Sequence, residues 1–329
     1  MKRDVFMMSG GRLKRKDNTL YFVNEEGLSR PLPIEQTDNI HIFGQVDMNS
    51  SMLHLLSSHG VQLHLYNYYG FYDGSFVPRK KQVSGFTVVQ QSSHVWDNEK
   101  RMYIARQFIQ SAVHHMQRNI RKYGAEEEVS SYIGTLSAHA ALLDEARSIP
   151  QLMGIEGQCR QVYYGSFNCM LKGGWKWEYR SKRPPHDPIN AMISFGNSIM
   201  YTAVLSEIYK TVLDPTISFL HESSSKRYSL CLDIAEIFKP LITDSIIFNL
   251  INNRRIQEKH FDQEDGLVYL SDEGRKRFLA AFDEKMKSTF KHRQLKRNVS
   301  YRYLIRLEAY KLIKHMIGDT VYKPFKAWW

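Results

Sequence analysis

Carboxylate and imidazole side chains in three segments are of the types that hold divalent metal ions in phosphodiester chemistry. The first segment contains Glu156 and Arg160, the second ends at His221, and the third contains Asp233 and Glu236. Each segment is a weak indication by itself. The question is therefore whether the fold brings the three together.

Glu156 and Arg160 share one helix face with Tyr163 if a helix begins near Pro150. A glutamate four residues before an arginine is usually only a surface ion pair. The first segment alone therefore predicts a solvated helix face.

His221 follows an apolar stretch, Leu213–Leu220, that has the character of a loop. A neutral imidazole binds divalent metals, but it also commonly fills a half-buried position with one hydrogen bond. Considered without its neighbours, His221 is more typical of the second case.

Asp233 and Glu236 are three residues apart among apolar side chains, so a helix would bury both on one face. Two buried carboxylates cost several kcal/mol unless a positive charge compensates them. A metal ion is one such partner. Lys239, Arg227 or a helix N-terminus is the structural alternative, and the segment alone leaves both open.

The elements that would position these residues change in kind along the chain. Apolar residues with period two at 19–23, 39–43 and 61–66 predict a β-rich first part. A short helix through Leu53 and Leu56 is expected between the last two runs, with Asn49 or Ser50 at its start and Gly60 at its end. A hairpin is expected near Gly70.

After the β-rich part, residues 78–81 and the polar stretch 90–93 are interpreted as a linker. Beyond it the apolar period becomes 3.6, which indicates helices. Pro150 behind Ser148 and Pro188 behind Asp187 are expected to start two of them. The first long helix is expected to bury one apolar stripe, which consists of Met102, Ala105, Ile109, Ala112, Val113, Met116 and Ile120.

Charge is unevenly distributed over the 329 residues, whose net charge is +11. Residues 1–77 contain seven Lys and Arg against eight Asp and Glu, whereas residues 285–329 contain twelve against two. A basic segment on a nearly neutral body is typical of polyanion binding. The segment is expected to form a helix whose Arg302, Arg306 and Lys314 face away from its apolar side.

Composition excludes several classes of protein. No apolar run approaches the roughly 20 residues needed to cross a bilayer, and no signal peptide is recognisable, so a cytoplasmic protein without membrane contact is expected. Three cysteines without paired spacing indicate neither a disulfide framework nor structural zinc.

In this order, the three segments resemble the CRISPR-associated adaptation nuclease, the catalytic integrase subunit of spacer acquisition. Its glutamate motif resembles Gly154–Gly157 followed by Arg160, and its middle motif resembles 183–191 running into Ser194-Phe-Gly. Its last motif resembles 213–221 followed by 230–240. The resemblance implies an α+β fold: a small N-terminal β-sandwich-like domain at 1–85, used for dimerisation, followed by a larger all-α catalytic domain at 86–329 that binds metal and DNA.

The resemblance also implies the site. Glu156, His221 and Glu236 are the expected metal ligands, with Asp233 as a further catalytic acid. Relatives often carry aspartate where this chain has Glu236. Two carboxylates and an imidazole suit Mg²⁺ or Mn²⁺ with open water positions better than a closed zinc site.

The implied activity is that of a metal-dependent DNA endonuclease and integrase, which inserts spacer DNA into a CRISPR array by attack of a 3′-hydroxyl on a phosphodiester. Candidate phosphate-binding residues, on charge alone, are Arg160, Lys239, Lys291, Arg293, Lys296 and Arg297.

The expected partners are double-stranded DNA (the spacer precursor and the CRISPR repeat), a second copy of the chain, and a small second Cas adaptation subunit in a hetero-hexamer. Two alternatives stay open: a branched-DNA repair nuclease and a non-catalytic nucleic-acid-binding protein.

Overall fold

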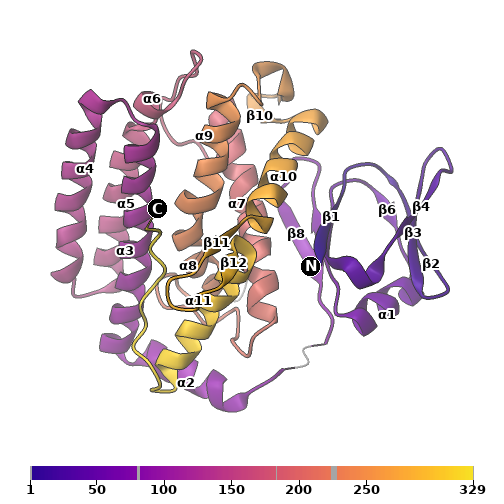
Figure 1. Ribbon diagram of the computed structural model, residues 1–329, viewed down its shortest axis with the longest axis horizontal. Helices are drawn as coiled ribbons and strands as arrows, with labels where there is room; N and C mark the ends of the chain where they lie inside the picture. The colour runs from indigo at the N-terminus through magenta and orange to yellow at the C-terminus, as the bar shows by residue number, and fades with distance from the viewer. Residues whose placement is uncertain (1, 80–81, 183, 224–227, 329) are drawn as a thin grey trace.

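The computed structural model describes the chain except residues 1, 80–81, 183, 224–227 and 329 (Figure 1). Its β-rich part contains two four-stranded sheets. The first sheet has the order β1 (Arg3–Met7), β5 (Thr37–Ile42), β7 (Gln62–Tyr66) and β8 (Tyr72–Phe76). Its first three strands are parallel, and β8 is antiparallel to β7. The second has the order β4 (Ser29–Leu32), β3 (Thr19–Asn24), β2 (Gly11–Lys16) and β6 (Val46–Asp47).

Helix α1 (Ser50–His59) joins both sheets in one apolar cluster that includes Leu20, Ile40 and Leu56. The predicted ends of this helix are confirmed. The Asn49 side chain accepts a hydrogen bond from the backbone N–H of Met52 at 3.0 Å, and Gly60 ends the helix with a left-handed φ of 67°.

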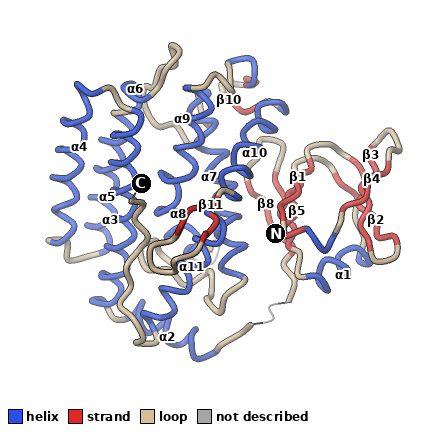
Figure 2. The backbone as a smooth tube through the Cα atoms, in the orientation of Figure 1, coloured by secondary structure: helices blue, strands red, loops and turns tan. Residues whose placement is uncertain are grey.

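The rest of the chain is mainly helical, and Figures 1 and 2 show its helices beside the two sheets. The α-helices are α2 (Gly85–Trp96), α3 (Asn98–Tyr123), α4 (Glu126–Ala141), α5 (Ile149–Gly165), α6 (Phe167–Met170), α7 (Pro188–Tyr209), α8 (Ser229–Phe238), α9 (Ser245–Asn252), α10 (Asp272–Lys287) and α11 (Tyr301–Met316). Two short antiparallel pairs correct the all-α expectation: β9 (Phe261–Glu264) with β10 (Leu267–Leu270), and β11 (Thr289–Lys291) with β12 (Asn298–Ser300). In the part of the chain that the structure covers, no helix is long and apolar enough to span a membrane.

The interpretation of residues 90–93 as linker is wrong, because they lie inside α2. The side chain of Gln91 is buried and donates hydrogen bonds to the carbonyl oxygens of Asp214 and Ile217, at 2.9 and 2.8 Å. A polar residue on this helix therefore anchors the loop that follows α7. Of the other predicted linker segment, residues 80–81 lie outside the described residues.

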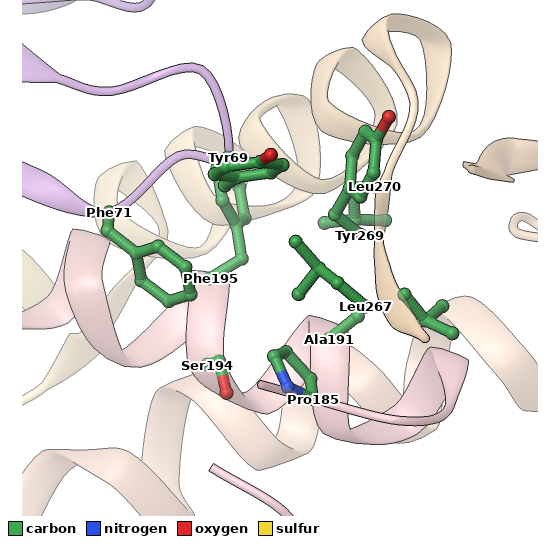
Figure 3. Close-up of a pocket in the computed structure, with 10 residues that line it drawn as sticks. Tyr69, Phe71, Pro185, Ala191, Ser194, Phe195, Leu267, Tyr269 and Leu270 are labelled. Atoms are coloured by element: carbon green, nitrogen blue, oxygen red, sulfur yellow. The ribbon is translucent and has the colours of Figure 1, made fainter. Parts of the chain in front are cut away.

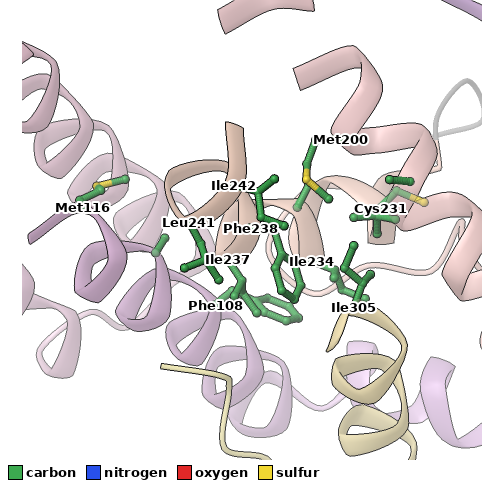
Figure 4. Packing of buried hydrophobic residues seen from close by; sticks show 14 of the residues in the cluster. Phe108, Met116, Met200, Cys231, Ile234, Ile237, Phe238, Leu241, Ile242 and Ile305 are labelled. Carbon is green, nitrogen blue, oxygen red and sulfur yellow. The ribbon is translucent and has the colours of Figure 1, made fainter. Parts of the chain in front are cut away.

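Helix α8 lies at the centre of the helical body and packs against α3, α7 and α11. The apolar stripe predicted for α3 is confirmed, since its members are buried. Figure 4 shows Phe108 of α3 against Ile237 of α8, with Met200 of α7 and Ile305 of α11 close by. Nearly every residue of α8 is buried, so its two carboxylates need partners inside the protein.

Polar contacts join the first sheet to the helical body. The hydroxyl of Tyr66 lies 2.7 Å from Oγ1 of Thr202 on α7, and Arg302 of α11 forms a buried ion pair with Asp4 of β1. The basic segment does form a helix, but Arg302 is buried and does not face away from the apolar side of this helix. Arg306 also pairs within the chain, with Glu207 at 2.7 Å. These two cations are therefore used in holding the fold together.

Candidate active site

Helix α5 presents Glu156 and Arg160 on one face. Its predicted start is confirmed, with the Ser148 side chain accepting from the N–H of Gln151 and Pro150 in the first turn. The Nε atom of Arg160 donates to Oε1 of Glu156, and its Nη2 atom donates to Oε2 of Glu236 on α8. The pair on α5 is therefore not a surface ion pair, because it reaches a buried carboxylate on another helix.

Asp233 builds the loop that carries His221. Its Oδ2 atom accepts the backbone N–H groups of Phe219 and Leu220, at 2.7 and 2.9 Å. Its Oδ1 atom accepts the N–H of His221 at 2.9 Å and lies 2.8 Å from Nδ1 of the same residue. A carboxylate only accepts hydrogen bonds, so the proton of the imidazole is on Nδ1. In the neutral imidazole, the Nε2 atom of His221 therefore has a lone pair for a ligand.

A π-helical turn, Lys239–Asp244, follows α8. Pro240 has no N–H group, so the regular helical hydrogen bonding is interrupted there. Two side chains of α3 donate to carbonyl oxygens here, one at the end of α8 and one in the turn. The Nδ1 atom of His115 donates to Ile237 at 3.0 Å, and Nδ2 of Asn119 donates to Pro240 at 2.7 Å.

Lys239, at the start of the turn, donates to Oε1 of Glu236 at 2.6 Å. Its Nζ atom also lies 4.8 Å from the ring centroid of Tyr201 on α7. Of the alternatives left open for the carboxylates of α8, a lysine therefore compensates Glu236, together with Arg160. Arg227 lies outside the described residues.

The charged groups around Glu156 shift its pKa. Burial raises the pKa of Glu156, but Arg160, and then Lys239 and His221, outweigh it and hold this pKa below its ordinary value. When His221 is protonated, it is therefore close enough to Glu156 to lower the pKa of this carboxyl. Glu156, Glu236 and His221 belong to one electrostatic cluster.

Asp244 lies at the end of the π-helical turn, and its carboxylate is almost fully buried. Burial raises its pKa to about 6, while Arg160, a hydrogen bond with Tyr163, Lys239 and Arg180 oppose the rise. Three cations therefore lower the pKa of one buried acid near the predicted ligands.

The donor types of the cluster fit a hard divalent cation, because carboxylate oxygens and one imidazole nitrogen are present. In the arrangement described, however, the guanidinium of Arg160 joins Glu156 to Glu236. Among the residues that the structure covers, no three His, Cys, Asp or Glu side chains are grouped so as to hold a metal ion. The residue types fit the ion, but Arg160 contacts the oxygen atoms that an ion would need.

The other candidate cations lie on a separate element. Lys291, Arg293, Lys296 and Arg297 belong to the β11–β12 hairpin, and all four are exposed. Two of them lie over aromatic rings, Arg293 at 4.7 Å from Trp328 and Arg297 at 5.7 Å from Tyr303. These contacts hold the guanidinium groups at the surface.

The middle motif serves the packing around the start of α7. The side chain of Asn190 accepts from Nη1 of Arg180 at 2.7 Å, and Nη2 of Arg180 donates to Ser194 at 3.1 Å. Ser194 also lines a small cavity of about 10 Å³ between α7, β10 and the β7–β8 loop (Figure 3). This cavity has room for about one water molecule and contains none of the predicted ligands. Arg183 lies outside the described residues.

Four further residues of the site were missed from sequence: His115, Asn119, Tyr163 as a partner of Asp244, and Asp244 itself. His115 and Asn119 are four apart on the otherwise apolar face of α3. Polar residues on such a face and a proline inside a helical pattern are the signals that could have indicated the buried turn.

The fold, two sheets followed by a mainly helical body, matches a solved structure of a Cas1 protein from Thermotoga maritima with a TM-score of 0.89 and 39% identity, over 97% of this chain and 99% of that one. Two structures at 19% identity share the fold. One is a casposase bound to an integration product (TM-score 0.86, 98% of this chain and 93% of that one). The other is a Cas6-RT-Cas1–Cas2 complex (TM-score 0.84, 99% of this chain and 36% of that one).

The family model described as CRISPR associated protein Cas1 matches residues 5–284. CRISPR-associated endonucleases Cas1 from Thermodesulfovibrio yellowstonii and Clostridium perfringens are each 52% identical to this chain, over 99% and 100% of it and 100% of their own lengths. The chain therefore belongs to the Cas1 family of CRISPR-associated endonucleases, the integrases of spacer acquisition. The predictions of this family, of an α+β fold and of an enzyme are confirmed.

Proposed function

We propose that Glu156, His221 and Glu236 hold one Mg²⁺ or Mn²⁺ ion, and that this ion supports the endonuclease and integrase activity. The observation that carries the proposal is the set of four contacts that Asp233 makes with the His221 loop. Asp233 orients the imidazole and leaves Nε2 unprotonated, as a metal ligand requires. Asp233 is therefore a positioning residue of the site.

A bound divalent ion supplies polarisation of a phosphodiester and a lowered pKa of the attacking oxygen. Side chains of the protein would bind and orient the phosphate. Lys239 and Arg160 place positive charge where a phosphate would approach Glu156 and Glu236. The 3′-hydroxyl of incoming DNA is the attacking group in integration, and water is the attacking group in cleavage. Both are displacements at phosphorus, so one site serves both.

The exposed β11–β12 hairpin is a second region of DNA contact in this proposal. Lys291, Arg293, Lys296 and Arg297 would bind the backbone of double-stranded DNA, from the spacer precursor or the CRISPR repeat. Support comes from their exposure and from the rings that hold Arg293 and Arg297 in place.

The assembly follows the same proposal. Residues 1–85 form the dimerisation domain and residues 86–329 the catalytic domain, and dimers combine with a small second Cas subunit in a hetero-hexamer. One related fold is in a complex with Cas2, and another is bound to an integration product. The outer strand β4 leaves an exposed sheet edge for protein contact. Because the CRISPR array on which it acts is cellular DNA, the protein acts in the cytoplasm.

Metal binding and strand transfer, measured on the same preparations, test the proposal. Isothermal titration with Mn²⁺ should give one site per chain in the wild type and none in Glu156→Ala, His221→Ala or Glu236→Ala. Strand transfer from a 3′-hydroxyl DNA should be lost in the same variants. Glu145→Ala, which removes an exposed carboxylate from the loop before α5, is the matched control. Retained binding in two of the three ligand variants would refute the ligand set.

A further inference from the structure

Arg160 holds the two carboxylates of the proposed metal site at the same time. Its Nε atom donates to Glu156 and its Nη2 atom donates to Glu236. The second oxygen of Glu236 accepts from Lys239 at 2.6 Å. Without a divalent ion, the negative charge of these carboxylates is thus already compensated from inside the protein.

A divalent ion and the guanidinium compete for the same oxygen atoms. A guanidinium is not deprotonated in proteins, so Arg160 cannot release these oxygen atoms by losing its charge. Arg160 therefore stays charged and must move when the ion binds. A charged side chain that is four-fifths buried needs another acid nearby, or its displacement would be very unfavourable.

Asp244 is such an acid. This residue is 3% exposed, its carboxylate forms a hydrogen bond with Tyr163, and Arg160 lowers its pKa. Tyr163, the hydrogen-bond partner of Asp244, is three residues from Arg160 on α5. If the guanidinium of Arg160 leaves Glu156, Asp244 is therefore an acid near it. The proposed metal site makes no use of Asp244, although Arg160, Lys239 and Arg180 already stabilise its charge.

Building on the metal site proposed above, we infer that Arg160 is an internal competitor of the divalent ion, and that Asp244 holds the displaced guanidinium inside the site. With the ion bound, Arg160, Lys239 and Arg180 remain around one buried acid. The loaded site then carries an excess of positive charge toward the phosphate of the substrate. The metal-free site is close to neutral, so metal loading and phosphate binding are coupled.

Titration of the full-length chain with Mn²⁺ tests the inference, because competition predicts that removing a side chain of the site increases metal affinity. Arg160→Gln should bind Mn²⁺ more tightly than the wild type, by about tenfold, since the ion no longer displaces a cation. Asp244→Asn should bind about tenfold more weakly, because Arg160 then has no second acid. The double variant should bind like Arg160→Gln, since Asp244 matters only while Arg160 is present.

A general structural role would give the opposite sign, since damage to the site lowers metal affinity. Arg106→Gln is the matched control: this half-buried arginine of α3 donates to the carbonyl of Leu143 at 2.7 Å, outside the site. If Arg160→Gln does not fold without metal, Arg160→Lys replaces it. A lysine has no fork to bridge two carboxylates, so it should also bind Mn²⁺ more tightly than the wild type.

The outcomes separate the two proposals. Unchanged or weaker binding in Arg160→Gln or Arg160→Lys, with the wild type still binding one ion, would overturn the competition and leave the metal site standing. No binding by the wild type would refute the metal site, and with it the competition. Additive effects in the double variant would overturn the role of Asp244.

Discussion

Asp233 and His221 form a pair in which one carboxylate oxygen accepts both the backbone N–H and Nδ1 of the same histidine, at 2.9 and 2.8 Å. The other oxygen holds the two preceding residues of the loop. Asp233 therefore determines both the position of the loop and the tautomer of the imidazole. We therefore propose that Asp233, the predicted catalytic acid, acts through His221.

Replacing Asp233 by asparagine should reduce metal affinity by about 10- to 100-fold, because the amide has only one accepting oxygen and cannot hold Nδ1–H and the loop together. It should also destabilise the fold by about 1–3 kcal/mol, through donors left unsatisfied. Mn²⁺ titration and urea denaturation measure the two effects. A loss of stability with unchanged metal affinity would make Asp233 a structural acid only.

Alanine variants of the two glutamates should differ in their free energy of unfolding, although both residues are proposed ligands. Glu236 is buried and compensates Arg160 and Lys239, so Glu236→Ala should cost about 3–5 kcal/mol by leaving buried cations unpaired. Glu156 is more exposed, and Glu156→Ala should cost less. Chemical denaturation without metal gives this order. Equal stabilities would mean that Glu236 is not the main partner of these cations.

Part of this site could be predicted from sequence and part could not. The shared face of Glu156 and Arg160 follows from helical spacing, and the caps at Ser148 and Asp187 were predicted correctly. The partners of Asp233 could not be predicted, because they are backbone groups of a loop without a periodic pattern. Arg302 was misplaced for a similar reason, since its partner Asp4 is 298 residues away. The π-helical turn depends on side chains of α3, which local propensity does not include.

Asn119 should stabilise the turn that carries Lys239. Its side chain is buried and donates to Pro240 at 2.7 Å and to the Tyr163 hydroxyl at 2.9 Å. Asn119→Ala should destabilise the fold by about 1–3 kcal/mol, because the carbonyl of Pro240 loses its donor. Urea denaturation checks this, with Gln117→Ala on the outer side of α3 as control. A change no larger than the control's would contradict the role given to Asn119.

Blocking the 3′-hydroxyl of the donor DNA should stop strand transfer but leave hydrolytic cleavage, since only strand transfer uses that oxygen as the nucleophile. Gel assays with matched 3′-hydroxyl and 3′-blocked substrates measure both products. Equal loss of both would argue against one site with two attacking groups.

Neutralising Lys291, Arg293, Lys296 and Arg297 together should weaken duplex binding without regard to sequence. Each phosphate contact contributes about 0.9 to the slope of log K against log salt, so the slope should fall by roughly two to four units. Binding isotherms at several salt concentrations give the slope, and Mn²⁺ affinity should stay unchanged. An unaltered slope would mean that these cations only face solvent.

The central claim is that Glu156, His221 and Glu236 bind one ion. An anomalous difference map at the manganese absorption edge, from crystals of the full chain grown with Mn²⁺, tests this claim most directly. We expect one strong peak per chain, bonded to Nε2 of His221 and to an oxygen of each glutamate, with Arg160 moved toward Asp244. A peak at other residues, or none with Arg160 still between the glutamates, would contradict the account.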